Sequence, residues 1–536
     1  MWQQNYTPVA GSLGWSALVA AIPIFVLLYL IGIKRKPAWV AGVAGLVGAV
    51  AVAAAVYQMP ANLLVSSVVY GACFGLFPIG WIVYWAIVLY RITVETGNFD
   101  IIKDSVGGLT EDRRLQAMLI AFALGAFIEG AAGFGTPVAV AAAMLTGLGF
   151  SPFYAAGICL LANTAPVAFG SIGIPIVTLT GITGLPMQDL SSWVGRICAP
   201  VSLFIPAYLM MVMGGWRALR GVLPAAVLCG VSFAGTQFYV SNYIGPQLTD
   251  ILSSMAAIVS LVVLFKVWKP SDHFVFEAAS EVVEKPKQHD FTTTVRAWCP
   301  YLFLVVFVLL WGNDPVKSWI DKVTYAFNWP GLHNLIERIP PVVKAAGPYA
   351  APYRLNWLGA AGSACLLATL CSALVLRVSI ARYIGILVAV AKQLAFSMLT
   401  IACVLGLAYL MNYSGATGTL GLAFAATGVM FPFFSAMLGW LGVFLTGSDT
   451  SANALFGNLQ VVTANRLGLD PVLMAASNSS GGVMGKMISL QSIAVAAAAT
   501  GMRADDEAKL FRFTSKHSVF LAAVLGLITT FYAYMR

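Results

Sequence analysis

Two acidic residues stand inside long apolar stretches of the sequence, where a charge is costly. Glu129 lies in the segment 127–137 and Asp449 in the segment 444–453, and both segments are rich in glycine and hydroxyl residues. Ionisable residues at membrane depth are usually functional, and a desolvated carboxyl can take up and release a proton. We therefore predict that Glu129 and Asp449 are proton-coupling residues. A turn-stabilising carboxylate is the simpler alternative for both, and Asp449 with Ser448 would also suit a bound cation.

Small and polar side chains surround these two carboxylates and are typical of a site for a small anion. Backbone N–H groups, hydroxyls and amides can hold a carboxylate and read a neighbouring hydroxyl group. The predicted substrate-binding residues are Gly130, Gly133, Thr136, Asn163, Thr164, Ser448, Thr450, Asn453, Asn478, Ser479, Ser480 and Lys486.

Lys486 is the basic residue nearest to these groups in the sequence pattern. It suits a salt bridge to a substrate carboxylate, or an ion pair with Asp449 or Glu129, and a snorkelling interfacial lysine is the alternative. Arg196 closely follows Trp193 and is predicted to be an interface anchor or a structural pair. The eight cysteines and four histidines show no ligand spacing, so neither a metal site nor a cofactor is expected.

The two acidic segments belong to an internal repeat. Glu129 and Asp449 are 320 residues apart, and the prolines of the following turns, Pro152 and Pro471, are 319 apart. Downstream, Asn163 and Asn478 are each predicted to mark a helix break. Irregular backbone at membrane depth must be buried in protein or line a wet cavity, and it exposes half-helix N-termini suited to anions. Close helix packing through small residues is the alternative explanation.

The composition defines the solvent in which these elements fold. Of 536 residues, 60% are hydrophobic and only 10% are charged, whereas soluble chains carry about a quarter charged residues. This excludes a soluble enzyme, a disordered protein and a nucleic-acid binder. Runs suited to helical membrane spans occupy residues 14–33, 38–57, 61–93, 190–212, 219–239, 247–268, 297–312, 355–376, 392–412 and 515–535.

Two of these runs need comment. The first, 14–33, has no preceding basic region and is predicted to be a retained span rather than a removed signal peptide. The run 61–93 is too long for one upright span and contains Pro78, so it is predicted to be one tilted, kinked helix.

The net charge of +9 lies mostly in short connections, which the positive-inside rule places in the cytoplasm. This orientation predicts that both chain ends lie outside. It also predicts that hairpin 115–149 enters from the cytoplasm and hairpin 430–466 from outside, as in an inverted repeat. The segment 313–354 falls outside although it contains several basic residues, and it is predicted to be a small folded external cap.

The sequence thus predicts an all-α polytopic membrane protein with about 12 spans, two re-entrant hairpins and an inverted-topology repeat. The predicted parts are an N-terminal helical hairpin, a first repeat, a flexible cytoplasmic linker, connecting spans that include the cap segment, and a second repeat. They cover residues 1–60, 61–268, 269–296, 297–376 and 377–536.

Several motifs resemble the bacterial lactate permease family over essentially the whole chain. They are Met1–Tyr6, Asn98–Ile102, Glu129–Pro137, Tyr154–Gly157, Asn163–Gly170, Gly447–Asn453 and Ser477–Lys486. The resemblance implies a permease of the bacterial cytoplasmic (inner) membrane for L-lactate, D-lactate and glycolate, driven by proton symport. It also implies kinship with carriers that use paired hairpins and elevator-like motion.

Together, the residues and the resemblance favour a secondary active transporter, not an enzyme, that imports lactate and related 2-hydroxymonocarboxylates with protons. The expected partners are the small monocarboxylate, the proton and the lipid bilayer, without nucleic acid; a homodimer stays open. A sodium-coupled carrier of other small carboxylates is the nearest alternative. A membrane enzyme or oxidase subunit is disfavoured because the sequence has no nucleotide fingerprint and no pair of haem ligands. A passive channel is disfavoured because it does not explain the duplicated carboxylates.

Overall fold

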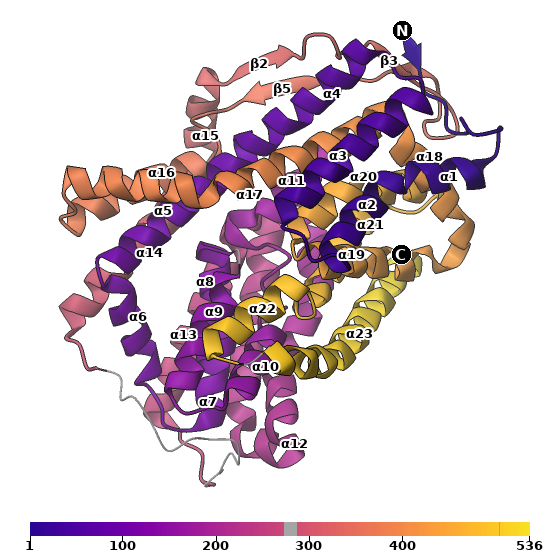
Figure 1. Cartoon of the computed structure of the whole chain (residues 1–536). Coiled ribbons are helices and arrows are strands. Elements are labelled where there is room, and N and C mark those ends of the chain that lie inside the picture. The colour runs from indigo at the N-terminus through magenta and orange to yellow at the C-terminus, as the bar shows by residue number, and fades with distance from the viewer. Residues whose placement is uncertain (134, 273–286, 503, 536) are drawn as a thin grey trace.

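The computed structural model describes residues 1–133, 135–272, 287–502 and 504–535, and it is a bundle of helices with a small β cap at one end (Figure 1). The helices before the first hairpin are α1 (Leu13–Ala20), α2 (Ile22–Gly32), α3 (Ala38–Ala55), α4 (Ala61–Phe74), α5 (Trp81–Glu95) and α6 (Asn98–Gly107). They are followed by α7 (Arg113–Gln116), α8 (Gly125–Ala131), α9 (Thr136–Gly147), α10 (Pro152–Ala162), α11 (Ile174–Thr183), α12 (Met187–Tyr243) and α13 (Thr249–Val267).

The second half of the chain is also helical. Its helices are α14 (Phe291–Gly312), α15 (Asp314–Ile320), α16 (Ala361–Val375), α17 (Ile380–Ser414), α18 (Ala416–Phe424), α19 (Phe431–Thr446), α20 (Asp449–Leu467), α21 (Pro471–Lys486), α22 (Leu490–Thr500) and α23 (Ala504–Tyr534). Short π- or 3₁₀-helical segments cover Gly75–Gly80, Ala117–Leu124, Ser171–Gly173, Pro246–Leu248, Asp321–Val323 and Ala425–Met430.

Ten helices in the described ranges are long and apolar enough to cross a membrane, or eleven when the bent pair α1 and α2 counts as one span. The structure therefore does not confirm the prediction of about 12 membrane spans. Helix α12 alone has 57 residues, and a straight helix of that length would extend for about 85 Å. Its backbone leaves the helical conformation at Gly214 and Gly215, so it contains both predicted runs 190–212 and 219–239.

Two other predicted runs differ from the structure in instructive ways. The run 61–93 is a kinked helix as predicted: α4 and α5 are joined through Gly75–Gly80, where Phe77 is extended because Pro78 follows it. The prediction for 355–376 was wrong at its start. Helix α16 begins only at Ala361 and has 15 residues, because the preceding residues form a strand and a turn.

The predicted cap segment, 313–354, contains short strands, and we call residues 313–355 the cap. Its strands are β2 (Tyr325–Asn328), β3 (Ile336–Arg338), β4 (Gly347–Pro348) and β5 (Pro352–Leu355), and the N-terminal β1 (Trp2–Gln3) joins them. Strand β1 pairs in parallel with β3 in the register Trp2 to Ile336, β3 pairs antiparallel with β4, and β2 pairs antiparallel with β5. The chain start is thereby attached to the cap (Figure 1).

The helices form two packed groups. In the first, α17 packs against α3 and α4, and α16 packs against α5 and α14. The second contains both hairpins: α8 and the preceding π segment pack on α9, and α19 packs on α20 and α21. These pairs correspond to the predicted hairpins 115–149 and 430–466. Contacts of α20 with α17 join the two groups beside the polar site, and α20 also packs against α11 within the second group.

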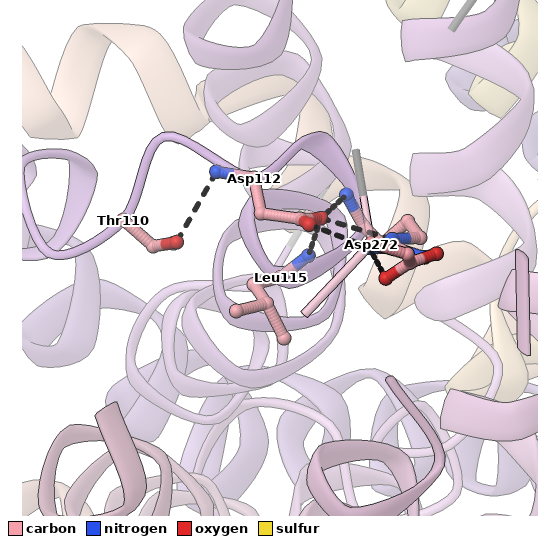
Figure 2. Close-up of polar contacts among 5 residues, drawn as sticks. Thr110, Asp112, Leu115 and Asp272 are labelled. Carbon is pink, nitrogen blue, oxygen red and sulfur yellow. Dashed lines mark hydrogen bonds and ion pairs between the residues drawn. The ribbon is translucent and has the colours of Figure 1, made fainter. Parts of the chain in front are cut away.

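The base of the first hairpin is anchored by a buried arginine. The Arg114 guanidinium donates to Asp112 at 2.7 Å and 3.1 Å and to Asp272 at 2.7 Å and 2.9 Å. Figure 2 shows Asp112 and Asp272 converging on this point, with Thr110 and Leu115 bonded to Asp112. Asp272 thus ties the chain after α13 to the hairpin. Half of the predicted linker 269–296, namely residues 273–286, lies outside the described residues.

Candidate functional site

A cavity of about 160 Å³ lies where the two hairpin tips meet. We call it the central cavity. The first hairpin contributes Glu129 and Gly133, and the second contributes Ser448, Asp449 and Thr450. The remaining polar lining comes from Ser171 after the first helix break, from Ser397 and Thr400 of α17, and from Thr446, Ser451, Lys486 and Gln491. Segments more than 300 residues apart therefore form one small polar chamber.

Asp449 begins helix α20 and is held in a defined orientation. The side chain is 4% exposed. Its Oδ2 accepts hydrogen bonds from the Ser479 hydroxyl at 2.6 Å and from the Asn453 amide at 3.2 Å. Its Oδ1 has no hydrogen-bond partner among the described residues. The position at the helix N-terminus also stabilises the carboxylate. Hydrogen bonds to Oδ2 therefore fix the side chain, while Oδ1 is available to bind a proton or a ligand.

A chain of amides continues from Asp449 into the protein. Asn453 donates to the Pro175 carbonyl at 3.2 Å, which joins α20 to α11. Asn478 donates to Asn453 Oδ1 at 2.9 Å and accepts from Gln460 at 3.0 Å. The Asn478 amide is therefore engaged on both sides and does not line the central cavity.

The predicted helix break at Asn478 is wrong. Helix α21 is continuous from Pro471 to Lys486, and the interruption comes at residues 487–489, before α22. Asn478 lies inside this helix, where its side chain donates to Asn453 and accepts from Gln460, both in α20. The first break is confirmed. Asn163 is the C-cap of α10, and no helix follows until the short 3₁₀ segment that begins at Ser171.

Glu129 occupies the first half of the site, in α8 just before the hairpin tip. It is 4% exposed, and its Oε2 has no hydrogen-bond partner in the described part of the chain. The Asn163 amide lies beside it, but neither polar atom of that amide reaches hydrogen-bond geometry with a described residue. Such orphaned polar atoms are rare in a protein interior and call for an explanation, such as a ligand or water.

The sequence analysis did not single out Asp250, which is the second buried carboxyl of this half. It is 1% exposed, neither oxygen has a partner among the residues described, and it interacts electrostatically with Glu129. A Cβ on Gly130 would lie 2.9 Å from the Asp250 Cβ, so the glycine lets α8 approach α13 here. Asp250 begins an apolar run after a short loop, a position also typical of an ordinary interfacial residue.

Lys486 ends helix α21 and lines the central cavity. Its ammonium donates to the Gly447 carbonyl at the second hairpin tip, at 2.7 Å. Within the described ranges it forms no salt bridge, although its charge acts on both Glu129 and Asp449. Lys486 is the one basic side chain among the described residues that line this cavity. A carboxylate entering the cavity would meet this charge.

The structure places the remaining predicted residues less directly. Thr164 donates to the Leu161 carbonyl at 2.8 Å, and Thr136 begins α9 outside the cavity lining. Ser480 is buried and its hydroxyl has no partner among the described residues. Arg196 donates to Asn242 at 2.9 Å and stacks on Trp193, which agrees with a structural pair.

The described residues contain no group of three or more His, Cys, Asp or Glu side chains that could hold a metal ion. The eight cysteines are unpaired in the structure, and several are buried among apolar side chains. The polar chemistry available at the site is thus that of carboxyls, hydroxyls, amides and one ammonium group.

Comparison with known proteins identifies the family of this chain. The sequence profile of the L-lactate permease family matches residues 16–536. The chain belongs to the L-lactate permease family. The L-lactate permease of Bacillus subtilis (strain 168) is 48% identical, over 98% of both chains. The glycolate permease GlcA of Escherichia coli (strain K12) is 44% identical, over 100% of this chain and 98% of that one.

Among solved structures, the YdaH transporter of Alcanivorax borkumensis is similar with a TM-score of 0.47 and 13% identity, covering 88% of this chain and 87% of that one. As a member of the L-lactate permease family with many apolar helices, the chain is a multi-pass membrane permease rather than an enzyme.

Proposed function

We propose that this permease imports lactate, and related 2-hydroxymonocarboxylates such as glycolate, across the bacterial cytoplasmic membrane by proton symport. The names of the relatives support the substrate class. The observation that carries the proposal is the small cavity at the hairpin tips, whose lining combines one ammonium group, Lys486, with two buried carboxyl groups, Glu129 and Asp449. Lys486 attracts the substrate carboxylate, and the carboxyl groups exchange protons.

Substrate binding follows from the donors around the cavity. The substrate carboxylate lies against Lys486 and the N-terminal end of α11 after the first break, whose first residues line the cavity; a helix N-terminus favours a bound anion. The hydroxyl on the neighbouring carbon is read by Ser448 or Thr450 at the second hairpin tip. In this proposal the second binding position for the substrate carboxylate is Lys486 at the end of α21, and not the predicted half-helix end at Asn478.

Proton coupling follows from the carboxyls. Glu129 and Asp250 interact electrostatically, and the repulsion between two charged carboxylates is relieved when one of them takes a proton. Asp449 supplies a third group at the opposite tip. An unpaired anion is unstable in a medium of low dielectric, so binding a proton with the anion removes net charge before the loaded site moves.

The movement proposed is that of an elevator-like carrier. The group containing both hairpins, α8 to α13 and α19 to α23, carries the site against the group built on α17, α3, α4 and α5. Both chain ends are proposed to lie outside the cell.

The experiment is uptake of labelled L-lactate into proteoliposomes with imposed gradients. One proton per monoanion predicts about tenfold accumulation for each unit of inward pH gradient, because one pH unit corresponds to about 1.36 kcal/mol. A sodium gradient alone should produce no accumulation. Accumulation that follows sodium and ignores the pH gradient would overturn the proposed coupling.

Variants identify the coupling groups. Glu129→Gln and Asp250→Asn should lose accumulation against a gradient but keep exchange of labelled for unlabelled lactate. Glu111→Gln and Asp189→Asn are matched controls, because both of these side chains are exposed. If Glu129→Gln still accumulates lactate, Glu129 is not an essential proton carrier.

A further inference from the structure

A second, larger cavity of about 670 Å³ lies between the cap and the helices beneath it. We call it the vestibule. Strands β3 and β5 of the cap contribute Arg338 and Arg354, while α11, α17 and α20 contribute Thr180, Asn412 and Asn458. Several tyrosines form much of the remaining wall. The described residues that line the vestibule include two arginines and no acidic residue, so its field favours anions.

Arg338 is half-buried and has free hydrogen-bonding capacity. Its guanidinium lies 4.3 Å from the centre of the Tyr349 ring. Across the residues described, it forms no ion pair, and its buried Nε has no hydrogen-bond acceptor. Stacking on an aromatic ring fixes the plane of a guanidinium and leaves its edge for a carboxylate. Arg338 is thus positioned but not neutralised.

Asn412 supplies an independent observation. Its side chain is 6% exposed, and its Oδ1 accepts from Asn458 at 3.0 Å, which leaves its Nδ2 without a partner in the described ranges. The hydroxyl of Thr180, which also lines the vestibule, has no described partner either. The free groups of Arg338, Asn412 and Thr180 can all donate hydrogen bonds, and such a set suits a carboxylate rather than a cation.

The same three helices line the vestibule and the central cavity. Helix α11 contributes Pro175 to the central cavity and Thr180 to the vestibule, and α20 contributes Ser451 and then Asn458. In α17, the residues that line the central cavity also precede those that line the vestibule. The seven residues from Ser451 to Asn458 correspond to about 10 Å of helix. The two cavities therefore follow each other along these helices.

Close contacts join the three helices along the vestibule. The Tyr409 hydroxyl donates to the Gly181 carbonyl at 2.7 Å, which joins α17 to α11 beside the vestibule. Gly457 permits a close approach of α20 to Leu179 of α11. These contacts hold the helices together where they line the vestibule.

We propose that the vestibule is a second binding site for a small carboxylate anion, held by Arg338, Asn412 and Thr180. If the cap faces the outside, as the sequence predicts, this site is filled before the central cavity during uptake. The inference rests on the proposed function for the identity of the anion, and on the vestibule's own donors for its existence.

The test counts bound L-lactate on the whole purified protein by equilibrium dialysis with labelled substrate. The native protein should bind two lactates per chain, and Arg338→Gln should bind one. Thr180→Val, which removes only the hydroxyl group, should weaken the second binding event several-fold. This variant provides the test if Arg338→Gln does not fold. Lys344→Gln, an exposed cap residue outside the vestibule lining, should leave both events unchanged.

Uptake kinetics supply the second readout. Arg338→Gln should raise the KM for lactate about tenfold while the accumulation ratio for a given pH gradient stays the same, and Arg338→Lys should partly restore the KM. Transport with a single bound lactate in the native protein would overturn the vestibule site alone. Absence of both lactate binding and lactate transport would instead overturn the proposed function.

Discussion

Replacing Lys486 with glutamine should weaken lactate transport mainly through substrate affinity. The lysine is the one basic side chain among the described residues of the central cavity, and its ammonium is fixed by the Gly447 carbonyl at 2.7 Å. Glutamine keeps a hydrogen-bond donor of similar length but removes the charge. The substitution therefore separates the electrostatic contribution of Lys486 from its packing.

The magnitude follows from the size of the cavity. In a chamber of about 160 Å³, a bound carboxylate lies about 5 Å from the ammonium, and two unit charges at that distance attract by about 3.3 kcal/mol at an effective dielectric constant of ~20. Glu129 and Asp449 already share this charge. A net loss of about 1.5–3 kcal/mol is expected, which is about a tenfold to hundredfold increase in KM.

The assay measures initial rates of labelled L-lactate uptake over a range of concentrations in proteoliposomes. Lys486→Arg should keep most of the affinity, and Lys392→Gln on the exposed surface of α17 should change nothing. A KM within twofold of the native value for Lys486→Gln would refute a contact between this charge and the substrate. An unchanged KM with a lower maximal rate would place Lys486 in the translocation step instead.

Two further predictions concern Arg114 at the base of the first hairpin and Gly482, which packs against Asp449 of the second. Hydrogen bonds from the Arg114 guanidinium hold the pKa of Asp272 below its ordinary value. This stabilisation is complete above the unfolded-state pKa of about 3.9 and is lost as the pH falls through the lower folded-state value. Arg114→Gln should therefore lower the Tm at neutral pH and flatten its decline in acid, as measured by thermal unfolding in detergent, and an unchanged Tm profile would contradict this. Gly482→Ala would press a methyl group onto Asp449 Oδ1 and should reduce uptake more than tenfold, whereas Gly385→Ala, which meets open space, should retain it; equal uptake by both would show that the Asp449 position is not critical.

The local sequence was sufficient to locate the hairpins and their carboxylates. Glycines and hydroxyls interrupting an apolar run cannot continue as an ordinary span, and their repetition at a nearly constant spacing marked both Glu129 and Asp449. Pro78 with its neighbouring glycines likewise identified the kink, whereas the length and the aromatic and proline content of segment 313–354 predicted a folded cap. These features depend on short-range properties, namely the backbone freedom of glycine and proline and the poor solvation of charge in lipid.

Pattern reasoning failed where a residue's role depends on a distant neighbour. The motif around Asn478 resembles the break at Asn163, yet α21 continues through it because Asn453 and Gln460 satisfy the Asn478 side chain. Asp250 looks like a residue at the end of a loop. Its burial depends on α13 packing against Gly130 of the first hairpin.

The sequence alone determined that this chain is a membrane permease with two carboxylate-bearing hairpins, because composition, glycine placement and family motifs are properties of the chain itself. The tertiary structure decided which groups face one another. It brought Asp250 to Glu129, set Lys486 between the hairpin tips, and placed Arg338 of the cap above helices that also line the central cavity. Electrostatic interaction depends on distance in space and on burial, and neither is a property of position along the chain.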